Sequence, residues 1–276
     1  MITRACISIN NRCNLKCNYC HFHEKKENIF EEKMDVFQIL DNIKDHIEKN
    51  QISVFKLGFV GNGEPFLDFE LLKEYIHYID EYLKNGKIAA YTITNGTLAD
   101  REKLSFLKEH NVNVGFSIDG LKEIHNKLRC NSYEKVRDGI EIFRELYGKY
   151  PSMNCTVGKD VLEHKEETIE FFSEFKNRVT FSRMIGKHGI TLEEFHEFLE
   201  EAKKQMEVRT GGYDCTMYGG LCGAGMDNIF YANNRIYICG NCIDLLSLPA
   251  QTPLDKIDFK IENFERSKCY RESLGI

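Results

Sequence analysis

Short β-rich runs alternate with longer segments of helical periodicity, and this alternation limits the possible folds of the chain more than any other feature. Six runs rich in β-branched and aromatic residues predict strands, at 5–10, 54–60, 87–94, 112–118, 152–157 and 178–183. Apolar residues at i, i+3, i+4 and i+7 predict helices between and after them, at 34–50, 68–85, 98–111, 133–150, 162–177 and 191–208. A repeated strand–helix order is typical of a parallel sheet covered by helices, in a barrel or an open sheet. We therefore predict an α/β fold.

The chain changes character after residue 208. The segment that follows is rich in Gly, Cys and Tyr and has no helical period. Within it, 228–239 alternates like two strands around Asn233 and Asn234, residues that tolerate the positive φ of a hairpin turn. We predict a boundary here, with one domain at 1–208 and a small C-terminal domain at 209–276.

Three cysteines follow the first predicted strand at the spacing C-x3-C-x2-C: Cys13, Cys17 and Cys20. Three thiolates are one ligand short of a closed structural zinc site, whereas an iron–sulfur cubane held by three thiolates keeps one iron free for another ligand. The carboxyl end of a parallel strand is also where α/β barrels build their active sites. A zinc site completed by His21 or His23 is the alternative.

Charge and composition narrow the class of protein. The formal net charge of −6 gives no basic footprint for a nucleic-acid backbone, so a nucleic-acid partner is disfavoured. No apolar run approaches the ~18 residues of a membrane span, and the N-terminus has no signal-like apolar region. The eleven cysteines are concentrated at metal-ligand spacings, which favours metal binding over disulfides. We expect a soluble cytoplasmic protein without a membrane or nucleic-acid partner.

Several motifs together resemble one known family. The stretch CNLKCNYC (13–20) resembles the signature of the radical S-adenosylmethionine (AdoMet) enzymes, and GNGEP (61–65) resembles their Gly-Gly-Glu-Pro turn. TITNGTLAD (92–100) and FSIDG (116–120) are similar to sequence motifs of the peptide-modifying branch of this family. The resemblance implies a partial (β/α)6 TIM barrel in which Cys13, Cys17 and Cys20 hold a [4Fe–4S] cluster. AdoMet on its free iron would be cleaved to a 5′-deoxyadenosyl radical that abstracts a hydrogen atom from the substrate.

The same resemblance implies an AdoMet pocket at the strand ends. Its predicted residues are Tyr19, Gly61, Gly63, Glu64, Asn95, Ser117, Arg129, Val157 and Met184. Gly61 and Gly63 would permit close backbone approach, and Glu64 would accept from the AdoMet ammonium. No catalytic acid or base is assigned.

The remaining pocket residues each have a simpler interpretation. By the resemblance Ser117 and Asn95 would contact the ribose or carboxylate, and Arg129 would pair with a carboxylate. Alternatively, Asn95 begins an ordinary Asn-Gly turn and Arg129 is a solvated surface charge. Val157 and Met184 would flank the adenine, or belong to the core.

A second set of cysteines lies in the C-terminal segment. Its spacing, C-x6-C-x16-C-x2-C followed by Cys269, resembles the auxiliary-cluster segments called SPASM and twitch. A full SPASM segment carries seven cysteines and two clusters, whereas this segment has five. The resemblance implies one auxiliary [4Fe–4S] cluster, with Cys269 as the replacement if one of the first four is free; these four are Cys215, Cys222, Cys239 and Cys242. A zinc ribbon is the alternative.

The function implied by the resemblance is modification of a ribosomally made peptide or protein, by crosslinking or oxidation. A one-electron reductant such as flavodoxin or ferredoxin would be its partner. A twitch-type small-molecule oxidoreductase is the alternative enzyme, and a zinc-binding interaction protein on a barrel scaffold is the alternative class. Cys6, Cys130 and Cys155 lie outside both sets and receive no role.

Overall fold

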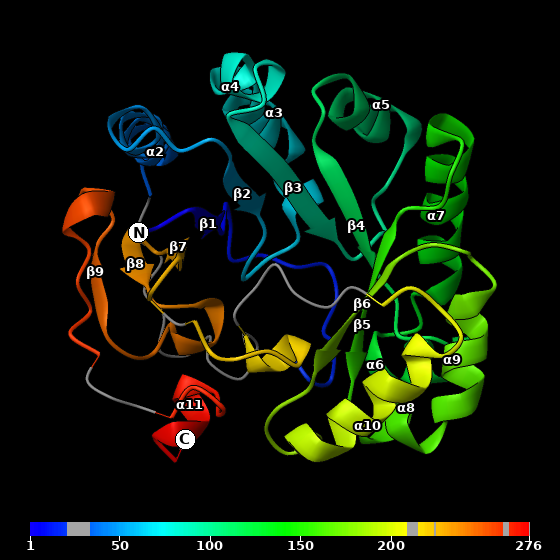
Figure 1. Cartoon of the computed structure of the whole chain (residues 1–276). Helices are drawn as coiled ribbons and strands as arrows, with labels where there is room; N and C mark the ends of the chain where they lie inside the picture. Colours follow the sequence, from blue (N-terminus) through cyan, green and yellow to red (C-terminus); the bar gives the residue numbers. More distant parts are fainter. Residues whose placement is uncertain (21–33, 209–214, 224, 262–264, 276) are drawn as a thin grey trace.

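The computed structural model describes residues 1–20, 34–208, 215–223, 225–261 and 265–275. Its described strands form one curved sheet in the order β6-β5-β4-β3-β2-β1-β7-β8-β9 (Figure 1). Neighbouring strands are parallel from β6 to β7, and the last two pairs are antiparallel. The strands are β1 (Arg4–Ile7), β2 (Phe55–Phe59), β3 (Ile88–Thr94), β4 (Asn113–Ser117), β5 (Ser152–Val157), β6 (Val179–Arg183), β7 (Asn228–Ala232), β8 (Arg235–Tyr237) and β9 (Ser247–Pro249).

Helices cover the outer face of the first six strands (Figure 1). Strands β3 and β5 alternate between fully buried and half-buried residues, because one face lies under the helices and the other faces the inside of the curve. The helices are α2 (Val36–Lys49), α3 (Phe69–Tyr78), α4 (Asp80–Lys84), α5 (Arg101–Glu109), α6 (Lys122–Leu128), α7 (Tyr133–Tyr147), α8 (Lys159–Glu163), α9 (Lys165–Ser173) and α10 (Leu192–Lys203). The predicted α/β fold with a parallel sheet is confirmed, as an open barrel of six strands.

The predicted strands agree with the structure, whereas the predicted helices 68–85 and 162–177 are each divided, the second between α8 and α9 at His164, and α6 is not among the predicted helices. The segment 68–85 forms α3 and α4, which meet at Ile79. The N–H group of Ile79 bonds to the carbonyl of Ile76, so the turn tightens there and the helix axis is interrupted. A short 3-10 turn, η2 (Pro65–Asp68), precedes α3 and brings the GNGEP motif out of β2.

The C-terminal segment continues the same sheet. Strand β7 pairs with β1, and the predicted hairpin follows, with Asn233 and Asn234 at φ values of 50° and 57°. Three 3-10 turns and one short helix complete the segment: η3 (Thr216–Tyr218), η4 (Gly240–Cys242), η5 (Leu254–Lys256) and α11 (Tyr270–Ser273). The domain boundary after residue 208 stays a prediction. None of the described helices has both the length and the apolar character that a membrane span requires.

Candidate active site

The loop that follows β1 carries the first three cysteines, all half-buried. Cys17 lies near enough to Cys13 and Cys20 that a thiolate charge on either neighbour would raise its pKa. Loss of hydration raises the pKa of the Cys13 thiol and raises the pKa of Cys17 to about 12. Such thiols become thiolates when a cationic centre binds them, because metal binding displaces their protons. The donor set therefore fits an iron–sulfur cluster.

A single-ion site is not formed by the residues that the structure describes. Among them, no group of three His, Cys, Asp or Glu side chains is placed to hold one metal ion. His21 and His23, which the zinc alternative needs, lie outside the described residues. That alternative stays a hypothesis.

The GNGEP turn after β2 packs directly against the cysteine loop. A Cβ atom on Gly61 would lie 2.4 Å from the Cβ of Ser8, and one on Gly63 would lie 2.4 Å from the carbonyl oxygen of Arg12. The N–H group of Glu64 donates to that same carbonyl at 2.7 Å. The two glycines are thus required for contact between the turn and the loop.

The Glu64 carboxylate joins the ends of β2 and β3. It is 2% exposed; its Oε1 accepts from Thr94 Oγ1 at 2.6 Å and from the Phe66 N–H group at 3.0 Å, and its Oε2 accepts from the Asn95 N–H group at 2.7 Å. Burial raises the pKa of Glu64, and these hydrogen bonds oppose that shift. The predicted contact with the AdoMet ammonium stays a prediction, and the carboxylate already holds the strand ends together.

Asn95 connects the end of β3 to the cysteine loop. Its Nδ2 donates to Asn14 Oδ1 at 2.9 Å and lies 3.8 Å from Cys13 Sγ. Its Oδ1 accepts from the N–H group of Thr97 at 3.0 Å. Gly96 has a φ of 79°, so the Asn-Gly pair does form a turn. The turn interpretation and the contact with the cysteine loop are therefore compatible.

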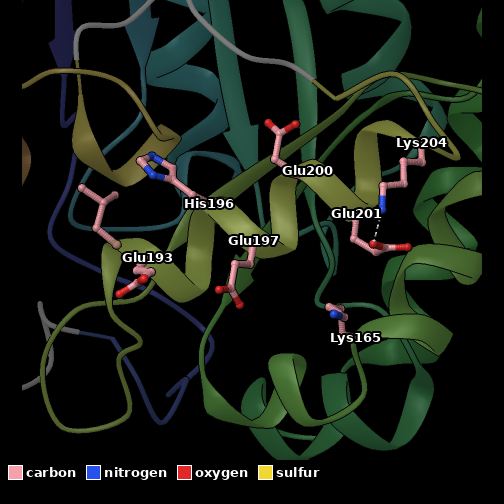
Figure 2. Close-up of a pocket in the computed structure, with 8 residues that line it drawn as sticks. Lys165, Glu193, His196, Glu197, Glu200, Glu201 and Lys204 are labelled. Carbon is pink, nitrogen blue, oxygen red and sulfur yellow. Dashed lines mark hydrogen bonds and ion pairs between the residues drawn. The ribbon is translucent and has the colours of Figure 1, made fainter.

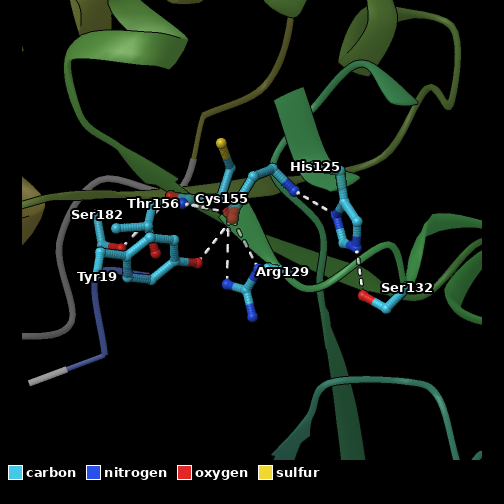
Figure 3. Close-up of polar contacts among 8 residues, drawn as sticks. Tyr19, His125, Arg129, Ser132, Cys155, Thr156 and Ser182 are labelled. Atoms are coloured by element: carbon cyan, nitrogen blue, oxygen red, sulfur yellow. Dashed lines mark hydrogen bonds and ion pairs between the residues drawn. The ribbon is translucent and has the colours of Figure 1, made fainter. Parts of the chain in front are cut away.

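A buried acidic residue, Asp119, lies just after the end of β4, and its partners Tyr19, Arg129 and Thr156 are labelled in Figure 3. Its carboxylate accepts from Tyr19 Oη at 2.7 Å, from Arg129 Nε at 2.7 Å and from the Thr156 N–H group at 3.0 Å. The alternative that Arg129 is a solvated surface charge is wrong, because the residue is 8% exposed. Asp119 lies inside the FSIDG motif and has no predicted role. Its position directly after a predicted strand is the one sign in the sequence that its carboxylate belongs to the site.

The ion pair of Arg129 and Asp119 acts on the cysteine loop. The Arg129 guanidinium lies over the Tyr19 ring, 5.3 Å from its centroid, and its charge opposes the upward shift in the pKa of Cys17. The N–H group of Asn18 also donates to the carbonyl of Leu128 at 3.0 Å. The loop is therefore held from the side of α6 by charge and by backbone bonding.

The last predicted pocket residues lie at the ends of β4, β5 and β6. Ser117 is half-buried and pairs with Asn154 across the sheet. Val157 and Met184 are buried together, and the Met184 N–H group donates to the Val157 carbonyl at 2.9 Å. Burial agrees with the core interpretation of these two residues, and the adenine contact stays a prediction.

The C-terminal cysteines converge in space. Cys215 lies near enough to Cys222, Cys239 and Cys269 that thiolate charges on these neighbours would raise its pKa. Charges on Cys222 and Cys239 would raise the pKa of Cys269 in the same way. Cys242 lies beside this group, with its Sγ 3.4 Å from that of Cys239. Loss of hydration raises the pKa of Cys215 to about 12 and raises that of Cys269, as in the first set. This donor set also fits a thiolate-bound cluster.

The other cysteines have protein environments of their own. Cys6 and Cys155 are buried, and Cys6 Sγ lies 3.3 Å from Tyr91 Oη. Burial raises the pKa of Cys155 well above its usual range, so this thiol stays protonated. Cys130 is exposed.

Two of the hollows among the described residues lie outside the cysteine loops. One is an open surface groove of about 680 Å³ along α10, whose charged side chains include the paired Glu201 and Lys204 (Figure 2). It contains no predicted cofactor residue, and we interpret it as a solvated helix face. The other, of about 350 Å³, lies on the inner face of the sheet and includes Tyr91, Asn154 and Thr180 in its lining.

Comparison with known proteins identifies the family. The model of the Radical SAM superfamily matches residues 7–172, more than half of the chain. The protein therefore belongs to the radical SAM superfamily, and the predicted family is confirmed.

Individual relatives include two kinds of sulfatase-maturating enzyme. The chain is 28% identical over 168 residues to a cysteine-type anaerobic sulfatase-maturating enzyme of Clostridium novyi, covering 58% of this chain and 45% of that one. It is 26% identical over 223 residues to a serine-type enzyme of Bacteroides thetaiotaomicron, covering 75% and 54%. The chain thus spans about half the length of these curated relatives.

The same fold occurs in a solved structure, native anSMEcpe with bound AdoMet. The TM-score is 0.74 at 22% sequence identity, and the match covers 93% of this chain and 81% of that one. At this identity the likeness establishes the fold.

Proposed function

We propose that this radical SAM enzyme modifies a residue of a ribosomally made peptide or protein, by oxidation or crosslinking. The observation that carries the proposal is the presence of two separate sets of cysteines. One set lies beside the strand-end motifs and the other lies in the C-terminal segment. The similarity to both cysteine-type and serine-type sulfatase-maturating enzymes supports a peptide residue as substrate. Flavodoxin or ferredoxin would supply electrons.

Each part of the chain has a definite task in this proposal. Cys13, Cys17 and Cys20 would hold a [4Fe–4S] cluster, which with AdoMet supplies hydrogen-abstracting radical chemistry. Glu64 and Asp119 hold the strand ends and the loop at fixed separations through their hydrogen bonds. Fixed geometry of this kind lowers the cost of orienting a substrate beside the reacting atoms.

The auxiliary cluster would be held by four of the five C-terminal cysteines. Cys215, Cys222 and Cys239 would supply three of the ligands. The fourth would be Cys242, whose Sγ lies 3.4 Å from that of Cys239, or its replacement Cys269, which lies near Cys215, Cys222 and Cys239.

The hollow on the inner face of the sheet lies toward the amino ends of the strands, away from the predicted AdoMet pocket. Its lining includes polar side chains from β3, β5 and β6, among them Tyr91, Asn154 and Thr180. A peptide side chain would instead approach the predicted pocket at the carboxyl ends of these strands, where parallel barrels build their active sites. A small-molecule substrate would use the same space.

The test combines metal analysis with AdoMet cleavage. The protein, reconstituted anaerobically with iron and sulfide, should hold roughly eight irons, as two cubane clusters require. Replacing Cys13, Cys17 and Cys20 together by Ala should remove about half of this iron and abolish formation of 5′-deoxyadenosine, while the auxiliary iron stays. A triple variant that still forms 5′-deoxyadenosine would refute the assignment, and zinc in place of iron would support the zinc-protein alternative.

The substrate class needs a separate test. Peptides that contain a central Cys or Ser would be incubated with the enzyme, AdoMet and reduced flavodoxin. A mass decrease at that residue, accompanied by 5′-deoxyadenosine, is the expected result for oxidation. Turnover of small alcohols with no reaction of any peptide would favour the small-molecule oxidoreductase.

A further inference from the structure

An ion pair between a buried arginine and a partly exposed glutamate joins the end of β6 to the short helix α11. Arg183, the last residue of β6, is 4% exposed and its Nη2 donates to Glu272 Oε2 at 2.6 Å. Its Nη1 donates to the carbonyl of Ile190 at 3.1 Å, which fixes the guanidinium from the barrel side. This pair joins the barrel to the segment that carries Cys269.

The same carboxylate oxygen also contacts the cysteine. Glu272 Oε2 accepts from the backbone N–H group of Cys269 at 3.3 Å. The N–H group of Ser273 in turn donates to the Cys269 carbonyl at 2.8 Å, closing one turn of helix. The Oε2 atom of Glu272 thus accepts from the Arg183 guanidinium and from the Cys269 backbone N–H group. Because Arg183 fixes this carboxylate, it also helps to fix the position of Cys269.

We propose that Arg183 and Glu272 are positioning residues that hold Cys269 in the auxiliary cluster and set the reduction potential of that cluster. The inference rests on the proposed auxiliary cluster. Reduction adds one negative charge to a cluster, so nearby fixed charges change its potential in opposite directions according to their sign. The Arg183 side chain is 5% exposed, so solvent screens its charge less than it would at the surface, whereas the Glu272 side chain is 36% exposed and its charge is screened more.

The structure predicts shifts of opposite sign for the two partners. Glu272→Gln keeps the shape and an acceptor oxygen but removes a negative charge, so the auxiliary cluster should become easier to reduce. Arg183→Gln removes a positive charge, so the cluster should become harder to reduce. Arg183→Gln should alter the ratio of reduced to oxidised cluster about tenfold at a fixed potential, or about 59 mV for a one-electron couple. Glu272→Gln should give a smaller shift, because solvent screens its charge more. A purely structural role would not produce opposite signs.

The measurement is a redox titration of the full chain, followed by electron paramagnetic resonance. The triple variant of Cys13, Cys17 and Cys20 identifies the auxiliary signal. Glu265→Gln is the matched control, because Glu265 pairs with Lys268 at 3.0 Å on the same segment but both side chains are about two-thirds exposed. Its potential should equal that of the unmodified protein. Arg183→Lys, which keeps the positive charge, should have a potential close to that of the unmodified protein, and it serves as the second variant if Arg183→Gln misfolds.

The outcomes separate this inference from the proposed function. Opposite shifts for Glu272→Gln and Arg183→Gln, with no shift for Glu265→Gln, support it. Equal potentials, or shifts in the same direction, in proteins that retain the auxiliary iron would overturn it while leaving the cluster in place. An unmodified protein without an auxiliary signal would contradict the proposed cluster itself, and with it this inference.

Discussion

Asp119→Asn tests whether the cysteine loop depends on a buried charge. Asp119 is fully buried, and its carboxylate accepts from Tyr19, Arg129 and Thr156. An asparagine of nearly the same size keeps one acceptor oxygen but replaces the other with an NH2 group. The substitution therefore leaves the Arg129 guanidinium charged, buried and without its carboxylate.

The expected loss of stability can be worked from the burial of the pair. The side chains of Arg129 and Asp119 are 10% and 0% exposed, and breaking such a pair costs about 3–5 kcal/mol. At about 2–4 °C per kcal/mol for a chain of this size, the melting temperature should fall by roughly 6–20 °C. The salt bridge of Lys127 with Asp160, whose side chains are 64% and 25% exposed, should contribute at most about 1 kcal/mol.

The assay compares Asp119→Asn with Asp160→Asn as the surface control. Anaerobic thermal unfolding gives the change in melting temperature, and iron content with 5′-deoxyadenosine formation reports on the first cluster. We expect Asp119→Asn to lose iron from this cluster as well as stability, since Tyr19 and Cys17 share one loop. Asp160→Asn should change the melting temperature by less than about 4 °C. If the two variants behaved alike and both kept full cleavage activity, the reasoning from the buried pair would be refuted.

The remaining predictions concern cofactor binding, acid stability and the auxiliary cysteines. Glu64→Ala or Ser117→Ala should weaken AdoMet affinity by about 1–3 kcal/mol, the scale of a lost hydrogen bond to a charged or buried group; unchanged calorimetric affinity in both variants would move the pocket elsewhere. Burial lowers the pKa of His125 from 6.5 to about 4. Because the unfolded chain then binds the proton more readily, stability should fall by up to about 3 kcal/mol as the pH drops from 6.5 to 4. Thermal unfolding across that range would measure this loss, and His125→Gln should show a flatter pH dependence. Replacing Cys222 and Cys239 by Ala should remove about four of roughly eight irons and reduce substrate turnover more than AdoMet cleavage; full iron content would exclude the second cluster.

Local patterns predict the strands and the hairpin well. The predicted strand limits lie within three residues of β1 to β6, because buried parallel strands require short runs of β-branched and aromatic residues. The hairpin follows from Asn233 and Asn234, the residue type that adopts positive φ at the turn. The division of 68–85 into two helices has no such local signal, since neither Gly nor Pro occurs near Ile79 and the apolar period continues across it.

Partners distant in the sequence are less predictable. From the sequence, Arg129 could be interpreted either as a cofactor contact or as a surface charge. Its pairing with Asp119 decides against the surface charge, and that pairing depends on how α6 packs against β4. Cys269 is similarly separated from Cys239 by 29 intervening residues, so spacing alone cannot rank it against Cys242. Only the fold brings Cys269 beside the other C-terminal thiols. Motif order therefore predicts which strand ends meet, and tertiary packing decides which side chains pair there.

The pairing at these strand ends also bears on the order of assembly. Glu64, Asp119 and Arg129 all have hydrogen-bond partners within the protein, so the free energy that fixes them comes from folding and not from AdoMet. A binding site that is already ordered loses less conformational entropy when its ligand arrives. The thiols of Cys13 and Cys17, by contrast, have raised pKa values, and a bound cationic centre would displace their protons. The chain should therefore fold its barrel first, bind the cluster next and receive AdoMet last, in a pocket whose walls change little between these steps.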